Sequence, residues 1–301
     1  MALAHVSRQS GKPHLLHCEF QPLSVDDDPV SVLQMRIKQL GLQKVPVNTS
    51  LLVNEFSLLM LEAPNVEPGE MQQAIRWNLR DQIDFDIEQA VVDVFEIPRQ
   101  TDSSRMAMVY VVVARKQTIQ HYVDQMESAE VNLQYIDIPQ LAQRNISQLL
   151  TEEQTGVALL SLNNNSGLLT LCHQDNLYLT REIESASIHA EPMPETSVDA
   201  TELQFATASS PQQDAINNVV LELQRSLDYY ESHFALSPIT NLTLSPSDEP
   251  LDNVVEMIEQ ASGMRVKLCQ LNELIEADFE LTQQLQTRCF QAIGLALREV
   301  A

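Results

Sequence analysis

Two stretches of the chain carry apolar residues at helical spacing. In the first half, Met71, Ile75, Leu79 and Ile83 recur every four residues, which predicts a helix over about 69–83. The second half carries a longer stripe whose members step by four and three, which predicts one continuous helix. The members of this stripe are Ile216, Val220, Leu223, Leu227, Tyr230 and Phe234.

Strand-like runs lie between further helical segments. The run 106–114 is apolar nearly throughout, which suits a strand that is covered on both faces. Other strand-like runs are 1–6, 15–20, 45–53, 56–61, 90–97, 133–138, 157–162, 168–172, 177–183, 240–244 and 265–268. Further helices are expected over 30–40, from 116 onward, over 251–261 and at the C-terminal end. Strands and helices alternate in both halves, which predicts two α/β layers.

The length and the composition predict two domains. A chain of 301 residues is long enough for about two domains, each with its own core. The second half begins after 151–155, and residues from about 184 to 212 are rich in Ser, Thr, Ala, Glu and Pro without periodicity. We expect this segment to be a mobile insertion. The chain opens directly on a strand-like segment, so we expect an earlier strand of the sheet to be missing.

The charge balance limits the partners. The chain has 18 Lys and Arg against 42 Asp and Glu, which gives a net charge of −24 at pH 7. Nucleic acid and an anionic bilayer are disfavoured, because both are bound through Lys and Arg. The longest strongly apolar run, 106–114, is about half as long as the ~20 residues of a membrane-spanning helix. We therefore expect any membrane attachment to run through a partner protein with a basic cytoplasmic tail.

The N-terminus and the cysteines indicate a cytoplasmic protein. No basic segment followed by an apolar one opens the chain, so we expect no signal peptide. Four cysteines are scattered without CxxC spacing, and we expect them to be reduced thiols. They are Cys18, Cys172, Cys269 and Cys289.

Motifs of phosphate binding and of nucleophilic catalysis are missing from the sequence. Only 7 glycines occur, and their spacing allows neither GxGxxG nor a Walker A loop. Neither GxSxG nor HExxH occurs. His14, His17 and Cys18 suggest a metal site. On a strand, however, His14 and His17 point to opposite faces, which favours polar hairpin positions over ligands.

Two other features allow both a functional and a structural interpretation. Four acidic residues follow the predicted helix 69–83 and could do acid–base work, but a solvated turn is the ordinary arrangement in so acidic a chain. Trp77, the only tryptophan, lies on the same helix and is either a packing residue or a recognition residue. The acidic residues are Asp81, Asp84, Asp86 and Glu88.

Several segments, taken in order, resemble the PilM family of type IV pilus assembly proteins. They are EMQQAIRW at 70–77, QIDFDIE at 82–88, VVDVF at 91–95, VVARK at 112–116, YIDI at 135–138, LTREI at 179–183 and LQRSLDYY at 223–230. The resemblance covers most of the chain in the correct order. It is strongest to the members that serve mannose-sensitive haemagglutinin (MSHA) pili.

The resemblance implies the actin-like fold that the family shares with the cell-division protein FtsA. This α/β fold has two domains that face a nucleotide cleft, and a small strand-helix-strand-strand module is inserted into the first domain. On this chain the resemblance implies a first actin-like subdomain over 1–54 and 116–150, without its first strand. The module would span 55–115, and the second domain would span 151–301.

The resemblance also implies a nucleotide and a partner. Family members bind ATP in the cleft and hold the short cytoplasmic N-terminal tail of an inner-membrane protein, PilN. The PilN counterpart in MSHA systems is MshJ. We expect the tail to lie between the first domain and the inserted module, with Asp84, Phe85 and Asp86 in contact with it.

The loops that would hold ATP depart from the family pattern. Ser161 and Asn163 stand where the family has its second Asp-x-Gly phosphate loop, and LSPSDEP at 244–250 replaces a Gly-Gly turn. A proline removes an amide donor, and side chains block close approach of the backbone. Three residues lie near the expected ribose contacts and are otherwise ordinary helix surface: Glu222, Arg225 and Ser226.

The sequence thus predicts a non-catalytic cytoplasmic adaptor of type IV pilus assembly, peripheral to the inner membrane through a partner, with no cofactor and no metal. The alternative is an actin-like ATP-binding protein or ATPase with a degenerate nucleotide cleft. A third hypothesis, an unrelated two-domain structural protein, predicts a closed ferredoxin-like βαββαβ unit in the first half.

Overall fold

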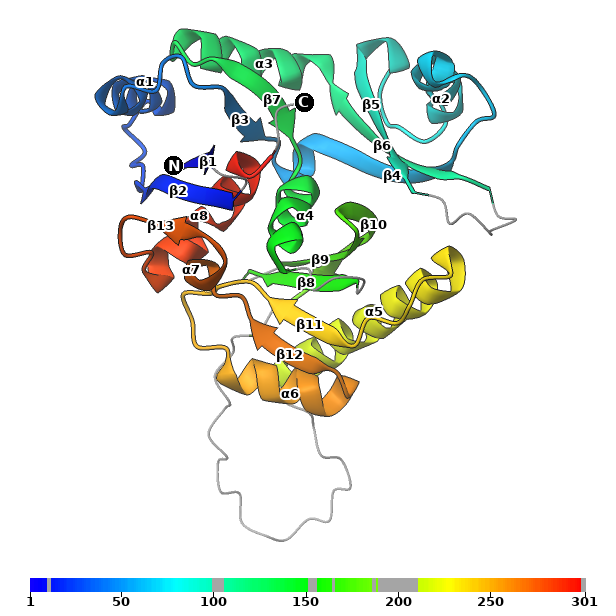
Figure 1. Ribbon diagram of the computed structural model, residues 1–301. Helices are drawn as coiled ribbons and strands as arrows, with labels where there is room; N and C mark the ends of the chain where they lie inside the picture. Colours follow the sequence, from blue (N-terminus) through cyan, green and yellow to red (C-terminus); the bar gives the residue numbers. More distant parts are fainter. Residues whose placement is uncertain are drawn as a thin grey trace, which may run out of the picture.

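The computed structural model of the protein describes residues 1–9, 12–98, 106–150, 156–163, 166–185, 188 and 211–298. Its helices and strands form two α/β domains, with a small module beside the first (Figure 1). The α/β class therefore agrees with the prediction from the sequence. The predicted insertion at about 184–212 lies almost entirely outside the described residues.

The first domain contains two small sheets. Their strands are β1 (Ala2–Gln9), β2 (Lys12–Phe20), β3 (Val47–Ser50), β7 (Leu133–Asp137) and β13 (Glu276–Ala277). One sheet has the order β1-β2-β13, in which β1 and β2 form the predicted N-terminal hairpin and β13 runs parallel to β2. The other sheet is the parallel pair of β3 and β7.

Two helices, α1 (Pro29–Leu40) and α3 (Lys116–Ser128), cover this domain. The start and the end of α1 confirm the predicted helix over 30–40. The Asp28 carboxylate accepts hydrogen bonds from the backbone N–H groups of Val30 and Ser31, which satisfies donors of the first turn. Gly41 ends the helix at a φ of 70°, a left-handed conformation that glycine adopts without strain.

The module is a three-stranded antiparallel sheet with one helix, in the predicted strand-helix-strand-strand order. Its strands β4 (Phe56–Glu62), β5 (Ala90–Ile97) and β6 (Met108–Arg115) have the sheet order β4-β6-β5. The helix α2 (Met71–Leu79) buries Ile75 against one face of this sheet. The short 3-10 helices of this region are η1 (Val53–Glu55), η2 (Pro68–Glu70) and η3 (Ile87–Gln89).

Helix α2 is shorter than the predicted helix 69–83, because the residues that follow Leu79 form turns. Aspartate side chains compete with the helix for backbone donors. Asp86, for example, accepts a hydrogen bond from the backbone N–H of Glu88 at 3.0 Å and begins η3.

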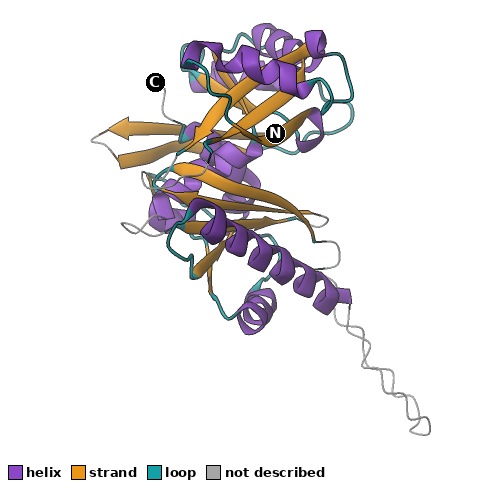
Figure 2. Ribbon diagram, turned by 90° about the vertical axis from the view of Figure 1, so that its right-hand side faces the viewer, coloured by secondary structure: helices purple, strands orange, loops and turns teal. Residues whose placement is uncertain are grey.

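The second domain has a five-stranded mixed sheet of order β10-β9-β8-β11-β12. The strands are β8 (Val157–Leu162), β9 (Ser166–His173), β10 (Asn176–Glu184), β11 (Asn241–Leu244) and β12 (Arg265–Leu268). The long helix α5 (Pro211–Phe234) lies along this sheet (Figure 2), and α6 (Asp252–Ser262) packs beside it. The predicted apolar stripe of α5 is confirmed, since all its members except the partly buried Leu227 are buried in the core. None of the helices in the described part of the chain has the length and apolarity that crossing a bilayer requires.

Two helices cross between the domains, α4 (Pro139–Leu150) and α8 (Gln283–Ala296) (Figure 1). At the crossing, Gly294 lies against the backbone of Ala142, and a Cβ atom at Gly294 would be 2.8 Å from the Ala142 carbonyl carbon. The Asn145 side-chain amide also donates a hydrogen bond to the Gly294 carbonyl at 2.8 Å. The two helices can therefore approach this closely because glycine has no side chain at position 294.

The end of the chain returns to the first domain. After the short helix α7 (Leu271–Leu274), β13 pairs with β2, and α8 packs on β1 and β2. The sequence assigns all of 151–301 to the second domain, whereas this last part lies against strands of the first. The reason is the apolar face of α8, where Phe290 and Ile293 share a core cluster with Leu15 of β2.

The two sheets of the first domain leave a gap between them. β1 and β3 are both edge strands and do not pair with each other. A cavity of about 420 Å³ lies between them and is lined by His5, Val6, Arg8, Val45, Pro46, Asn48, Ala296 and Arg298. The cavity therefore separates the free edges of these two strands.

Candidate functional site

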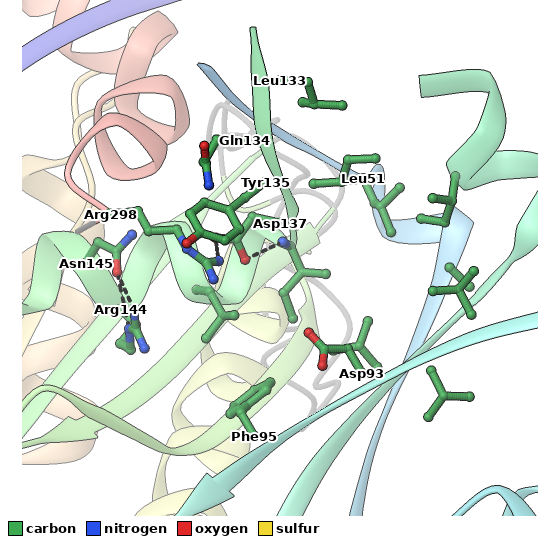
Figure 3. Close-up of a pocket in the computed structure, with 18 of the residues that line it drawn as sticks. Leu51, Asp93, Phe95, Leu133, Gln134, Tyr135, Asp137, Arg144, Asn145 and Arg298 are labelled. Atoms are coloured by element: carbon green, nitrogen blue, oxygen red, sulfur yellow. Dashed lines mark hydrogen bonds and ion pairs between the residues drawn. The ribbon is translucent and has the colours of Figure 1, made fainter. Parts of the chain in front are cut away.

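A larger cavity, of about 820 Å³, lies where the module meets the first domain (Figure 3). The module contributes β5 and β6, and the first domain contributes β7 and α3. Helix α4 adds residues from the crossing between the domains. Apolar residues of these elements line much of the cavity: Val91, Phe95, Val112, Ala114, Ile119 and Leu141.

Both β5 and β7 have a free edge at this cavity. β5 is an outer strand of the module sheet, and β7 pairs only with β3 among the described strands. Five consecutive residues, Leu133–Asp137, line the cavity, although successive side chains of a strand point to opposite faces. The strand therefore turns its edge, with unpaired N–H and C=O groups, toward the cavity. An extended peptide could pair with such an edge as an added strand.

An ion pair between a buried carboxylate and a partly exposed arginine stands at one side of the cavity. The Asp137 carboxylate, which is 3% exposed, accepts a hydrogen bond from the Ile138 N–H at 2.9 Å and forms an ion pair with Arg298. The Arg298 side chain lies next to the Tyr135 ring (Figure 3), and its guanidinium carbon is 4.0 Å from the ring centre. Charge pairing and stacking together fix this part of the cavity wall.

A second arginine, Arg144 of α4, lines the same cavity without a carboxylate partner among the described residues. Its Nε and Nη2 atoms donate to the Asn145 side-chain oxygen at 3.2 and 2.6 Å. Burial lowers the pKa of the Arg144 guanidinium, and the nearby Asp137 carboxylate only partly opposes this effect. The cavity thus holds one arginine with a carboxylate partner and one with an amide partner.

The three residues that the sequence proposes as partner contacts lie outside the lining of this cavity. Asp84 forms an ion pair with Arg115 at 3.3 Å, and the Arg115 guanidinium lies 4.1 Å from the centre of the Phe85 ring. Asp86 accepts a hydrogen bond from the Glu88 N–H. These contacts hold the loop between α2 and η3 onto the module, and contact of the three residues with a partner stays a prediction.

The three residues proposed near a ribose lie together on α5. The Arg225 Nη1 atom is 2.7 Å from the Glu222 carboxylate, and the Ser226 hydroxyl donates to the Glu222 carbonyl at 2.6 Å. Arg225 is largely exposed, whereas Ser226 is buried. These are contacts within one helix, and a role in nucleotide binding stays a prediction.

Two observations bear on the loops that would hold ATP, and whether these loops bind it stays a prediction. The Asn163 N–H, at the β8–β9 turn, donates to the Ser166 carbonyl at 2.8 Å and so is not free to bind a phosphate oxygen. Pro246 and Pro250 in the loop after β11 have no N–H to offer. Within the described residues, no group of three or more His, Cys, Asp or Glu side chains is placed to hold a metal ion.

The other singled-out residues have ordinary surroundings. The His14 Nε2 atom lies 3.3 Å from the Asp278 carboxylate, and the His17 Nε2 atom lies 3.2 Å from the Glu19 carboxylate. The Trp77 side chain is 64% exposed on α2, with the Arg80 guanidinium 4.5 Å from its ring centre. A recognition role of Trp77 therefore stays open.

Sequence reasoning missed the residues that give the cavity its polar character, namely Tyr135, Arg144, Asn145 and Arg298. The sequence carries a signal only for the wall that β5 contributes, because Val91, Asp93 and Phe95 alternate along this strand and so share one face of the module sheet. No such signal shows that Arg144 and Arg298 line the same cavity. They are far apart in sequence, and the crossing of α4 and α8 brings them to it.

Comparison with solved structures places this fold. The chain is similar to a chain of the structure described as the PilM–PilN type IV pilus biogenesis complex, with 20% identity and a TM-score of 0.69 over 98% of this chain and 94% of that chain. More distant is the cytoplasmic domain of EpsL, an inner-membrane component of the type II secretion system of Vibrio cholerae, with 11% identity, 97% and 95% coverage and a TM-score of 0.46. A Bacteroides thetaiotaomicron protein with an actin-like ATPase fold and unknown function has 10% identity, 94% coverage of both chains and a TM-score of 0.44. No family model matches the chain, and no curated protein matches it in sequence.

The protein therefore has the two-domain actin-like fold, with the strand-helix-strand-strand module in its first domain. Over almost its whole length it shares this fold with the structure of the PilM–PilN complex.

Proposed function

We propose that this protein is a non-catalytic adaptor of type IV pilus assembly. The cavity between β5 and β7 would dock the cytoplasmic N-terminal tail of an inner-membrane, PilN-like protein. The adaptor would lie on the cytoplasmic side of the inner membrane and reach it through this partner. We further propose an MSHA-type pilus, with an MshI-like role for this chain and an MshJ-like partner.

The observation that carries the proposal is that two free strand edges line one cavity. An extended tail can add its backbone to such an edge and place alternate side chains against the apolar lining. The likeness to the PilM–PilN structure supports this choice of partner. The net charge of −24 favours a tail rich in Lys and Arg, because opposite charges speed the encounter of two molecules.

Calorimetry with a synthetic peptide of the partner's cytoplasmic N-terminus tests the docking. We expect saturable binding at low and moderate salt. Val91 of β5 is 37% exposed at the cavity, so Val91→Arg should crowd the site and weaken binding by about tenfold or more. Leu221→Arg is the matched control, because Leu221 is 44% exposed on α5 and the substitution adds the same charge. No binding in either salt, or equal loss in both variants, would contradict the proposal.

The alternative function, an actin-like ATP-binding protein or ATPase, is tested separately. We expect no heat and no turnover when Mg-ATP is titrated, since the Asn163 N–H is already bonded and Pro246 lacks an N–H group. Micromolar affinity with turnover would favour the ATPase.

A further inference from the structure

Arg144 stands in the cavity with unmet hydrogen-bonding capacity. A guanidinium carries five N–H donors, and the bonds of Arg144 run from Nε and Nη2 to a single amide oxygen of Asn145. No carboxylate of the described residues pairs with it, although acidic residues outnumber basic ones by 42 to 18 in the chain. A shortage of acidic residues therefore does not explain the missing partner.

None of the three acidic side chains that line the cavity forms an ion pair with Arg144. Asp137 is paired with Arg298 and bonded to the Ile138 N–H. The Asp93 carboxylate accepts a hydrogen bond from the Val94 N–H at 2.9 Å. Asp175 lies exposed in the turn between β9 and β10 and attracts the guanidinium without forming an ion pair with it. Arg144 is thus the arginine of the cavity lining whose charge is not paired with a carboxylate of the described residues.

The structure also holds this guanidinium in place before any ligand arrives. Asn145 is 1% exposed, and its Nδ2 atom is bonded to the Gly294 carbonyl of α8 at 2.8 Å. This bond fixes the direction of the Asn145 side-chain oxygen, which in turn holds two nitrogens of Arg144 (Figure 3). A cation that is already oriented loses little freedom on binding, which favours affinity and specificity.

We propose that Arg144 binds a carboxylate side chain, from one Asp or Glu, of the tail that docks in this cavity. The inference rests on the proposed docking function and adds the chemistry that sets the tail's register. A carboxylate fits because a planar guanidinium presents paired N–H donors that two carboxylate oxygens can accept together. An overall basic tail would thus carry one acidic residue at a fixed position.

Variants of both molecules test the assignment. Arg144→Gln should weaken binding of the tail peptide by about 10- to 100-fold, the usual range for losing a charge-assisted hydrogen bond. Arg144→Lys should restore only part of the loss, because an ammonium lacks the planar fork. Changing one Asp to Asn, or one Glu to Gln, in the peptide should weaken its binding to the native protein by the same factor. The same peptide change should not weaken binding to the Arg144→Gln variant any further. Arg265→Gln, which removes an exposed arginine on β12, is the control and should change nothing.

A second measurement needs no peptide. N-acetyl-aspartate N-methylamide, titrated into the native protein, should shift the Arg144 Nε–Hε resonance, and the asparagine analogue should not. Equal response to both analogues, or to neither, overturns the carboxylate assignment even if Arg144→Gln fails to fold. A resonance that responds to Asp175→Asn but not to the carboxylate overturns it as well, because Asp175 would then be the partner. A tail that binds at Val91 without coupling to Arg144 overturns this inference and leaves the docking function standing.

Discussion

The crossing of α4 and α8 offers a stringent test of the fold, because it depends on the absence of one side chain. Gly294→Ala would place a Cβ atom 2.8 Å from the carbonyl carbon of Ala142, and closer still to its oxygen. Ordinary contact begins near 3.4 Å, and the obstacle is backbone rather than a flexible side chain. The two helices would have to move apart, and the bond from Asn145 to the Gly294 carbonyl would lengthen.

Two opposing effects set the size of the change. Alanine favours a helix over glycine by about 1 kcal/mol. Overpacking costs about 1–3 kcal/mol, and contact with rigid backbone places Gly294→Ala at the upper end. The net loss should be about 2 kcal/mol. Unfolding a chain of 301 residues carries an entropy of about 0.6 kcal/mol per kelvin, so the melting temperature should fall by about 3 °C.

Thermal and urea unfolding, followed by circular dichroism, measure this loss. Gly69→Ala is the matched control, because a Cβ atom at Gly69 would meet nothing within 4 Å and the residue has no positive φ. We expect the control to be neutral or slightly stabilising. If Gly294→Ala is as stable as the control, the close approach of α4 and α8 is wrong.

Three further predictions concern other parts of the fold. Asp137→Asn should destabilise the protein by about 3 kcal/mol in urea unfolding, because it leaves the Arg298 charge without its partner, and Arg298→Gln in the same chain should recover part of that loss. Hydrogen bonds, mainly from Arg36, hold the pKa of Glu19 below its ordinary value of 4.5. Glu19 therefore stabilises the fold above about pH 5, and this stabilisation is lost as the pH falls through the folded-state pKa. The difference in unfolding free energy between the native protein and Glu19→Gln should accordingly disappear in acid. A segment of alternating apolar and polar residues, fused ahead of Met1 through an Asn-Gly turn, should pair with β1 and raise the unfolding midpoint by filling the gap between β1 and β3. The same segment with prolines should have no such effect, because proline has no N–H to donate to the neighbouring strand.

Much of the fold could be predicted because its signals are local. Asp28 and Gly41 mark the ends of α1, and the apolar stripe of α5 follows from spacing alone. The strand-helix-strand-strand order of the module also follows from local periodicity. The end of α2 at Leu79 did not follow, because Ile83 continues the helical spacing while the aspartates around it favour turns.

The candidate site was harder to predict because it is assembled over long sequence distances. That a tail would lie between the first domain and the module follows from the family resemblance, and the cavity lies in that region. Its polar residues come mainly from β7, from α4 and from Arg298, two residues beyond the end of α8. Asp84, Phe85 and Asp86 lead into the strand pair of the module, and their contact with the tail stays a prediction. The module residues that line the cavity lie on β5 and β6.

Hydrogen exchange with and without the tail peptide tests the central claim most directly, because it reports which backbone amides become covered. The account predicts slower exchange along Leu133–Asp137 and Ala90–Ile97, the two strands whose free edges meet the cavity. Exchange on α5 around Glu222 should not change. Protection confined to α5 or to the loop at Asp84, with no change in β5 and β7, would contradict docking in this cavity.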